Sequence, residues 1–149
     1  MRLVNRVIRR LALEDGPGLE RLRRAYAAEI LDSEDEQVHG GFAPALLAQR
    51  DVLCWGGFVN GELVGFAVVA ELLEVMSGRC YGLLDGVYVA PHARHHGLAY
   101  ILLNTIIRHG EAEDWTHLRC LVPEADAETA ALCELLADEA PWRSFMIYY

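Results

Sequence analysis

Apolar and polar residues alternate at the start of the chain and then change to a helical spacing. Residues 3–13 alternate loosely, with valine and isoleucine between arginines, which predicts an edge strand. A Gly/Pro-rich break follows at 15–18, and from there apolar residues recur every three or four positions over 19–30, which predicts an amphipathic helix. We expect an acidic loop over 32–36 and a second, short helix over 42–50, which has a proline near its start.

The middle of the chain consists of apolar runs separated by turn signals. The runs 52–59 and 63–73 are joined by Asn60-Gly61, a dipeptide typical of tight hairpins because both residues tolerate a positive φ. A second turn signal, Ser77-Gly78, leads into a third run at 80–89. Together the three runs predict an antiparallel meander.

The last third of the chain changes between helical and extended patterns. Helical spacing covers 98–110, whose closing glycine is the expected stop. Short strands are expected at 117–122 and 143–149, on either side of an alanine- and leucine-rich helix over 127–137 that Asp126 caps. There is no internal repeat or linker, so all 149 residues are expected to form one α/β domain, with a mixed, mainly antiparallel sheet flanked by helices.

Composition narrows the class of protein. No apolar run reaches the roughly 18 residues of a membrane span, and no secretory signal is recognisable. The four cysteines are widely spaced, with no C-x-x-C pair, so we expect reduced thiols in a cytoplasmic protein. All 13 basic residues are arginine and 22 residues are acidic, for a formal net charge of −9, which argues against nonspecific nucleic-acid binding. The negative charge either attracts a cationic substrate or only keeps the protein soluble.

The segment 87–99, VYVAPHARHHGLA, has the strongest chemical signal. A strand ends at Val89 and a helix begins near Gly97, so several free backbone N–H groups are expected to meet where the helix begins. Unpaired amides and the helix dipole both favour an anion there. Gly97 allows a pyrophosphate to approach the backbone, and Arg94 adds a planar cation. The alternative is an ordinary strand–helix connection in which the glycine only eases a turn.

This segment resembles the acyl-CoA-binding signature of the GNAT acetyltransferase superfamily, Q/R-x-x-G-x-G/A after a strand that reads roughly V-x-P. The order of predicted elements is similar to that fold over residues 6–149. The resemblance implies that acetyl-CoA is the cofactor and enters a gap between the strands that end at Val89 and begin at His117. It implies that backbone groups of Val87, Tyr88 and Val89 bind the pantetheine arm, and that the pyrophosphate is bound by Arg94, His95, His96, Gly97, Leu98 and Ala99.

The helix at 127–137 resembles the family pattern but departs from it at two positions. Aligning A-A-L-C-E with the usual A-x-L-Y-E places Asp126 at a position that is often Asn and binds cofactor, and Cys133 at that of a Tyr which commonly protonates the departing thiolate. A thiol with a pKa near 8.5 is able to donate a proton. The alternative is that Cys133 is a small apolar residue facing the core. The usual G-F after this helix is also absent.

Asp85 is the candidate general base. The stretch L-D-G-V-Y-V resembles the L-E-D-L-Y-V of amine-acetylating members, and simple alternation places Asp85 on the same face as Val87 and Val89. A carboxylate there would accept a proton from an ammonium acceptor, directly or through water. A surface acid with no catalytic role is the alternative. No metal is expected from the cluster of histidines at 92–96, because their loop is already assigned to phosphate.

These observations predict an N-acetyltransferase that moves an acetyl group from acetyl-CoA directly to the primary amine of a small, cationic acceptor. Two alternatives stay open: a catalytically weak acyl-CoA-binding or sensing domain, favoured by the missing Tyr, and an enzyme that acetylates a protein or peptide. Two features favour an enzyme. One is Asp85, and the other is a group of acidic residues that, by the resemblance, borders the acceptor cleft, although a solvated acidic loop is the alternative: Glu29, Asp32, Glu34, Asp35 and Glu36. Neither a nucleic-acid nor a membrane partner is expected. A homodimer is expected only by analogy with the family.

Overall fold

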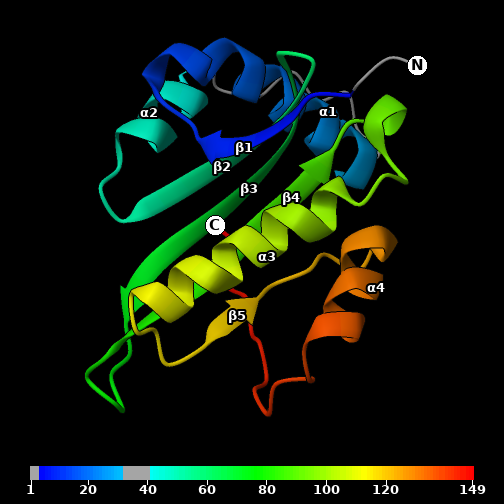
Figure 1. Cartoon of the computed structure of the whole chain (residues 1–149). Helices are drawn as coiled ribbons and strands as arrows, with labels where there is room; N and C mark the ends of the chain where they lie inside the picture. Colours follow the sequence, from blue (N-terminus) through cyan, green and yellow to red (C-terminus); the bar gives the residue numbers. More distant parts are fainter. Residues whose placement is uncertain (1–3, 32–40) are drawn as a thin grey trace.

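The computed structural model describes residues 4–31 and 41–149, so the acidic loop expected over 32–36 lies outside the described residues. Figure 1 shows a twisted sheet with helices on both sides. None of the described helices is both long and apolar enough to span a membrane. In chain order the elements are β1 (Arg6–Arg10), a 3₁₀ turn η1 (Leu13–Asp15), α1 (Gly16–Leu31), α2 (Phe42–Ala48), β2 (Val52–Val59), β3 (Glu62–Leu73), β4 (Cys80–Val89), a 3₁₀ turn η2 (Pro91–Ala93), α3 (Leu98–Ala112), β5 (Leu118–Cys120) and α4 (Ala127–Leu136).

The five strands lie in sequence order, β1-β2-β3-β4-β5, and only the last pair is parallel. The predicted meander and the hairpin at Asn60-Gly61 are confirmed. Asn60 has a φ of 50° and Gly61 of 82°, the left-handed pair that matches the twist of a two-residue hairpin. This mixed, mainly antiparallel sheet is the α/β architecture that the sequence predicted.

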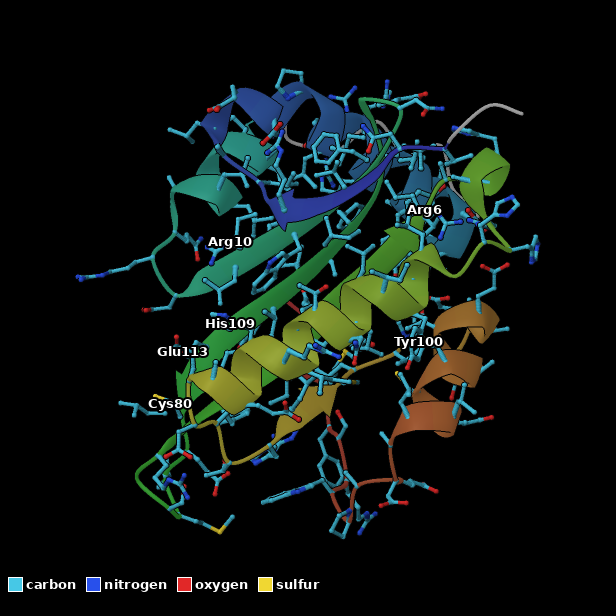
Figure 2. The ribbon with its side chains drawn as sticks, in the orientation of Figure 1. Arg6, Arg10, Cys80, Tyr100, His109 and Glu113 are labelled. Atoms are coloured by element: carbon cyan, nitrogen blue, oxygen red, sulfur yellow. The ribbon has the colours of Figure 1, made fainter. Side chains whose placement is uncertain are left out.

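Each face of the sheet has its own core. On one face, α1 and α2 pack Leu19, Leu22 and Ala43 against side chains of β2, β3 and β4. On the other face, α3 packs its apolar stripe, which includes Leu102 and Ile106, against the sheet. The ends of this second core are closed by aromatic rings. Trp55 lies between the Arg10 guanidinium, 5.0 Å from its ring, and the His109 imidazole, 5.1 Å from it; Figure 2 labels both neighbours.

A β-bulge in β4 changes the direction in which Asp85 points. Val68 pairs with Gly86 and Val69 pairs with Leu84, so Asp85 has no partner on β3. Because one residue is inserted, Leu84 and Val87 share the core under α3 although they are three positions apart. The expectation that Asp85 shares a face with Val87 and Val89 is therefore wrong: its carboxylate is exposed and acts electrostatically on Tyr26 of α1, on the opposite face.

The gap expected between β4 and β5 is present. The parallel pairing covers only three positions and ends at Leu84 with Cys120. Beyond that point Val87, Tyr88 and Val89 have no partner on β5, so backbone groups along this edge of β4 are left without a neighbouring strand. The N-terminus of α4 lies across this opening, as the lining residues of the cavity described below show.

Two predicted helix boundaries and one predicted strand are wrong. Helix α1 begins at Gly16, since Pro17 fits the first turn of a helix, where no N–H is needed. Helix α3 continues past Gly110, which is a packing residue: a Cβ there would lie 2.6 Å from the Trp115 ring. The segment 143–149 forms no strand, because nothing in the described structure pairs with it.

Candidate active site

A cavity of about 170 Å³ lies where the free edge of β4 faces α1 and α4. Its walls combine the β4 edge, the aromatic ring of Tyr26 and the first turn of α4. The lining residues are Tyr26, Glu29, Ile30, Val87, Tyr88, Val89, Arg94, Ala99, Ala125, Asp126, Ala127, Glu128 and Thr129. Among the predicted site residues, the cavity therefore brings together Val87–Val89, Arg94 and Ala99 from the segment 87–99 with Asp126 at the N-terminus of α4.

The N-terminus of α3 is open and able to bind an anion. Ile101 donates the first hydrogen bond of the helix, to the Gly97 carbonyl at 3.0 Å, so the preceding N–H groups have no helical partner. No side chain caps this end. Gly97 has a φ of 78°, and a Cβ added to it would meet nothing within 4 Å. The space over this turn is therefore open, and a group the size of a phosphate would be able to reach the backbone there.

Arg94 is turned back towards the protein. Its Nε donates to the Val89 carbonyl at 2.8 Å, and its Nη2 donates to the Glu29 carboxylate at 2.8 Å. Glu128 of α4 lies 3.6 Å from the same guanidinium. The hydrogen bond to Glu29 raises the pKa of Arg94 and lowers that of Glu29, since each stabilises the charged form of the other. In this conformation Arg94 joins its loop to α1 and β4, and the hydrogen-bond donors left open at this turn are backbone amides.

A hydrogen-bond network fixes α4 against α1. Asp126 is buried, accepts from the Thr129 N–H at 3.1 Å, and so caps α4 as the sequence predicted. Its Oδ2 atom also accepts from the Thr129 hydroxyl at 2.7 Å and from the Tyr26 hydroxyl at 3.1 Å. Burial and the nearby charges of Asp126 and Asp85 raise the pKa of Tyr26, so this phenol stays protonated.

The two candidate catalytic residues lie beside the cavity and not on its wall. Asp85 is exposed at the bulge and has no hydrogen-bond or ion-pair partner among residues 4–31 and 41–149. Cys133 lies one turn beyond Thr129, on the same face of α4, and is half-buried. Burial raises its pKa above the ordinary value, and its neighbour Cys120, with a pKa raised by burial to about 12, is held neutral as well.

The remaining motif residues point elsewhere. Leu98 is buried in the core under α3, and His95 is exposed with a φ of 67°. His96 lines a second cavity, of about 330 Å³, together with His92 and Arg6; Figure 2 labels Arg6. In the part of the chain that the structure describes, no three His, Cys, Asp or Glu residues are arranged to hold a metal ion.

The sequence does not predict the contacts that α1 makes in this site. Helical spacing places Tyr26 on an apolar face, and the family resemblance implies only that Glu29 borders the acceptor cleft; neither indicates a link to Arg94 or to the cap at Asp126. The helical spacing of Leu22 and Tyr26 indicated burial of both, but only the packing of α1 across β4 shows that the phenol reaches α4. Glu128 gave no signal in the sequence either, because an acidic residue is common in the first turn of a helix.

The fold is that of an acetyltransferase. Residues 17–136 match the profile of the Acetyltransferase (GNAT) family, and the chain belongs to that family. Members transfer an acetyl group from acetyl-CoA, and this protein is an acetyl-CoA-dependent acetyltransferase. A search of curated protein sequences finds no significant match.

Several solved structures share this fold over nearly the whole chain. The ribosomal-protein-alanine N-acetyltransferase from Brucella melitensis biovar Abortus 2308 is 28% identical, with a TM-score of 0.87 over 99% of this chain and 100% of that one. The aminoglycoside N-acetyltransferase AAC(6')-Iy, solved in complex with CoA, is 16% identical, with a TM-score of 0.78 over 99% of this chain and 97% of that one. An aminoglycoside acetyltransferase from an uncultured soil metagenomic sample, meta-AAC0020, solved with sisomicin, is 16% identical, with a TM-score of 0.79 over 97% and 95%. At 16% identity the latter two show the shared fold alone.

Proposed function

We propose that this enzyme acetylates the primary amine of a small, cationic acceptor. The observation that supports this acceptor is the charge of the cavity. Glu29, Asp126 and Glu128 line it, whereas Arg94, the one basic residue among the described lining residues, is already paired with two of these carboxylates. The exposed Asp85 lies close enough to raise the pKa of Tyr26 and adds a further negative charge. Such a surface attracts ammonium groups and disfavours anionic acceptors.

Three features in and beside this cavity support the proposed cofactor site. The open amides at the start of α3 suit the pyrophosphate, and Gly97 leaves room for it. The unpaired edge at Val87 and Val89 suits the amide groups of a pantetheine arm, as one more strand would. Asp126 lies on the cavity wall opposite β4, where one of its carboxylate oxygens would accept a hydrogen bond from an amide N–H of the cofactor. His95, His96, Leu98 and Ala99 contribute through the backbone of this turn.

The ammonium nitrogen loses two protons on its way to the amide. One leaves before the amine attacks the thioester, and the other leaves as the amide forms and balances the proton that sulfur gains, so that the group which protonates sulfur is restored. Acetyl-CoA supplies the thioester: the amine nitrogen forms a bond to the acetyl carbon, and the carbon–sulfur bond breaks. In this proposal Asp85, an unpaired carboxylate, takes the proton from the ammonium group. Cys133 returns a proton to the thiolate; its raised pKa keeps the thiol protonated at neutral pH, as a donor requires. The main contribution is orientation of the two substrates in one complex.

A second acceptor is favoured by one comparison. The Brucella enzyme, whose name gives ribosomal-protein alanine as its acceptor, is 28% identical over the whole chain. An N-terminal α-amine is also a cation, so the same acidic walls would accept it. The two candidates differ in length: an extended peptide needs an open path out of the cavity, whereas a small amine does not.

The test measures turnover with acetyl-CoA and three acceptor sets: polyamines, aminoglycosides and a peptide that begins with alanine. Asp85→Asn is the variant, and Glu113→Gln, an exposed carboxylate at the far end of α3 (Figure 2), is the control. We expect kcat to fall about 10²- to 10⁴-fold in Asp85→Asn, with acetyl-CoA affinity unchanged, and no change in the control. Turnover of the peptide alone would replace the small-amine proposal with the second one. Binding of acetyl-CoA without turnover of any amine would contradict both.

A further inference from the structure

Two cysteines meet where the gap between β4 and β5 opens. Cys120 is the last residue of β5 and pairs with Leu84, the last position at which the two strands are joined. Cys133 lies on α4, on the face that carries Asp126 and Thr129 towards the cavity. The two thiols are free, half-buried and joined by a side-chain hydrogen bond. A pair of thiols in contact therefore lies at the narrow end of this opening.

The contact between the thiols is suited to a disulfide bond. Two sulfur atoms in hydrogen-bond contact need only a small shift to bond covalently. The two cysteines belong to consecutive elements, and Figure 1 shows the chain running from β5 into α4 through a single connection. A disulfide between Cys120 and Cys133 would hold α4 against the end of β5. It would also consume the thiol to which the proposed function gives the role of proton donor.

The proposed function brings a third sulfur atom to this pair, and the inference rests on that function. If Cys133 returns a proton to the departing thiolate, the sulfur of CoA lies within hydrogen-bond distance of the Cys133 thiol. The disulfide form of the cofactor, bound in the same site, would then place its S–S bond beside Cys133. Thiol–disulfide exchange proceeds by attack of a thiolate on a disulfide sulfur. Binding in the cofactor site raises the effective concentration of that disulfide at the thiol.

We propose that Cys133 and Cys120 form a thiol–disulfide exchange site for coenzyme A disulfide, the oxidised dimer of the cofactor. Cys133 loses its proton to solvent and attacks one sulfur of this disulfide, which releases one CoA thiolate and leaves a mixed disulfide between Cys133 and CoA. Cys120 then loses its proton and attacks the Cys133 sulfur, which releases the second CoA thiolate. The two cysteines are oxidised to a disulfide, and their two electrons reduce the cofactor disulfide. The two CoA thiolates take up two protons from solvent and become thiols.

The environments of the two thiols support this order of attack. Burial raises the pKa of both, that of Cys120 to about 12, so few thiolates are present at neutral pH. Disulfides that do not bind beside the pair should therefore react slowly. The hydrogen bond that Cys120 donates partly offsets the effect of burial on Cys133. Cys133 is thus the attacking thiol, and Cys120 is the thiol that resolves the mixed disulfide.

Peptide mapping by mass spectrometry tests the proposal on reduced protein treated with coenzyme A disulfide. The wild type should form the Cys120–Cys133 disulfide, and dithiothreitol should reverse it. Acetyltransferase activity should fall at least about tenfold in parallel, because the proposed proton donor is consumed. Excess acetyl-CoA should slow the reaction by competing for the site. Glutathione disulfide at the same concentration should react at least about tenfold more slowly, because it lacks the nucleotide that binds the cofactor site.

Three serine variants separate the steps. Cys120→Ser should stop at the mixed disulfide, and Cys133→Ser should form neither product. Cys80→Ser is the matched control: Cys80 is a half-buried thiol at the first residue of β4 (Figure 2), so this variant should react as the wild type does. The experiments on the wild type do not depend on how well these variants fold.

Each outcome bears on one proposal. A wild type that forms no Cys120–Cys133 disulfide overturns this inference, even where the enzyme acetylates amines as proposed. A reaction that acetyl-CoA does not slow, or that is equally fast with glutathione disulfide, overturns the assignment of coenzyme A disulfide. The products are identified by mass and need no turnover. Absence of turnover with every amine would therefore contradict the proposed function alone.

Discussion

The hydroxyl of Tyr26 donates to the buried carboxylate of Asp126 at 3.1 Å, across 100 positions of sequence. This bond joins α1 to the N-terminus of α4 across the opening between β4 and β5. The ring of Tyr26 is held in place by Tyr88, whose centroid is 5.3 Å away, and by Phe66 at 6.3 Å. The cavity wall opposite β4 thus depends on a contact between the first and last described helices of the chain.

Tyr26→Phe should remove the hydrogen bond that joins α1 to α4 while keeping the packing of the ring in the core. The ring contacts remain, and the Asp126 carboxylate loses one donor, so we expect the free energy of unfolding to fall by about 1 kcal/mol. If α4 also shifts, the KM for acetyl-CoA should rise by up to about fivefold, the equivalent of the same energy, with a smaller change in kcat. Chemical denaturation and steady-state kinetics measure the two effects.

The control for this change is Tyr81→Phe. Tyr81 stacks on His117 at 4.8 Å, away from the cavity, so loss of its hydroxyl should leave the KM unchanged. A Tyr26→Phe enzyme with wild-type KM and stability would show that Thr129 alone is sufficient to hold Asp126.

Asp126 combines a helix cap with a place on the cavity wall, and two substitutions separate these roles. Asp126→Ala removes the acceptor for Thr129 and should lower the free energy of unfolding by about 1–2 kcal/mol. Asp126→Asn keeps an oxygen for the cap, and asparagine is as good a cap as aspartate, so stability should change little. If the charge of Asp126 contributes to binding a cationic acceptor, Asp126→Asn should raise the KM for the amine and not for acetyl-CoA. An Asn variant as unstable as the Ala variant would contradict the capping role.

Gly97 is expected to matter for the cofactor more than for the fold. Gly97 and Gly78 both have a left-handed φ, 78° and 69°, and a Cβ added to either meets nothing within 4 Å. Alanine at each should therefore cost a similar conformational strain, about 1 kcal/mol. Only Gly97→Ala places a methyl group over the open amides of α3, so only this variant should lose affinity for acetyl-CoA in calorimetric titration. If the two variants bound acetyl-CoA with equal affinity, the pyrophosphate would have to bind somewhere other than the turn at Gly97.

Much of the fold follows from local pattern, and the failures have physical causes. The strands β2, β3 and β4 were predicted with near-correct bounds because alternation and the Asn60-Gly61 turn are local signals. The bulge at Asp85 left no such signal, since it depends on how β4 aligns with β3, and it reversed the expected direction of that side chain. The missing strand at 143–149 is similar: the residues favour a strand, but pairing requires a neighbour that the local sequence does not specify.

The sequence predicts the local features of the candidate site but not the contacts between its elements. The open turn at Gly97 and the cap at Asp126 are short-range features that a motif and a capping preference indicate. The pairing of Arg94 with Glu29 and Glu128 joins three elements, and only the packed structure shows that this guanidinium is held by carboxylates.

The ion pair between Arg9 and Asp15 should make the free energy of unfolding depend on pH in the acidic range. Two Arg9 nitrogens donate to the Asp15 carboxylate at 2.8 and 2.9 Å, and the Ala12 N–H donates at 2.8 Å. The bond from Arg9 is the main cause that lowers the pKa of Asp15 below its ordinary value of 3.8. A lowered pKa in the folded state means that the contribution is present above the unfolded value and is lost as pH falls through the folded one.

Asp15→Asn should therefore lower the melting temperature clearly at pH 7, and the difference from wild type should shrink below pH 3.8. Thermal unfolding at a series of pH values measures this difference. Asp138→Asn is the control, because Asp138 is exposed and has no ion-pair partner among the described residues. The melting temperature of this variant should equal that of the wild type at every pH. A difference between Asp15→Asn and wild type that stays constant down to pH 2 would mean that the side chain stabilises η1 by hydrogen bonding alone, and not through its charge.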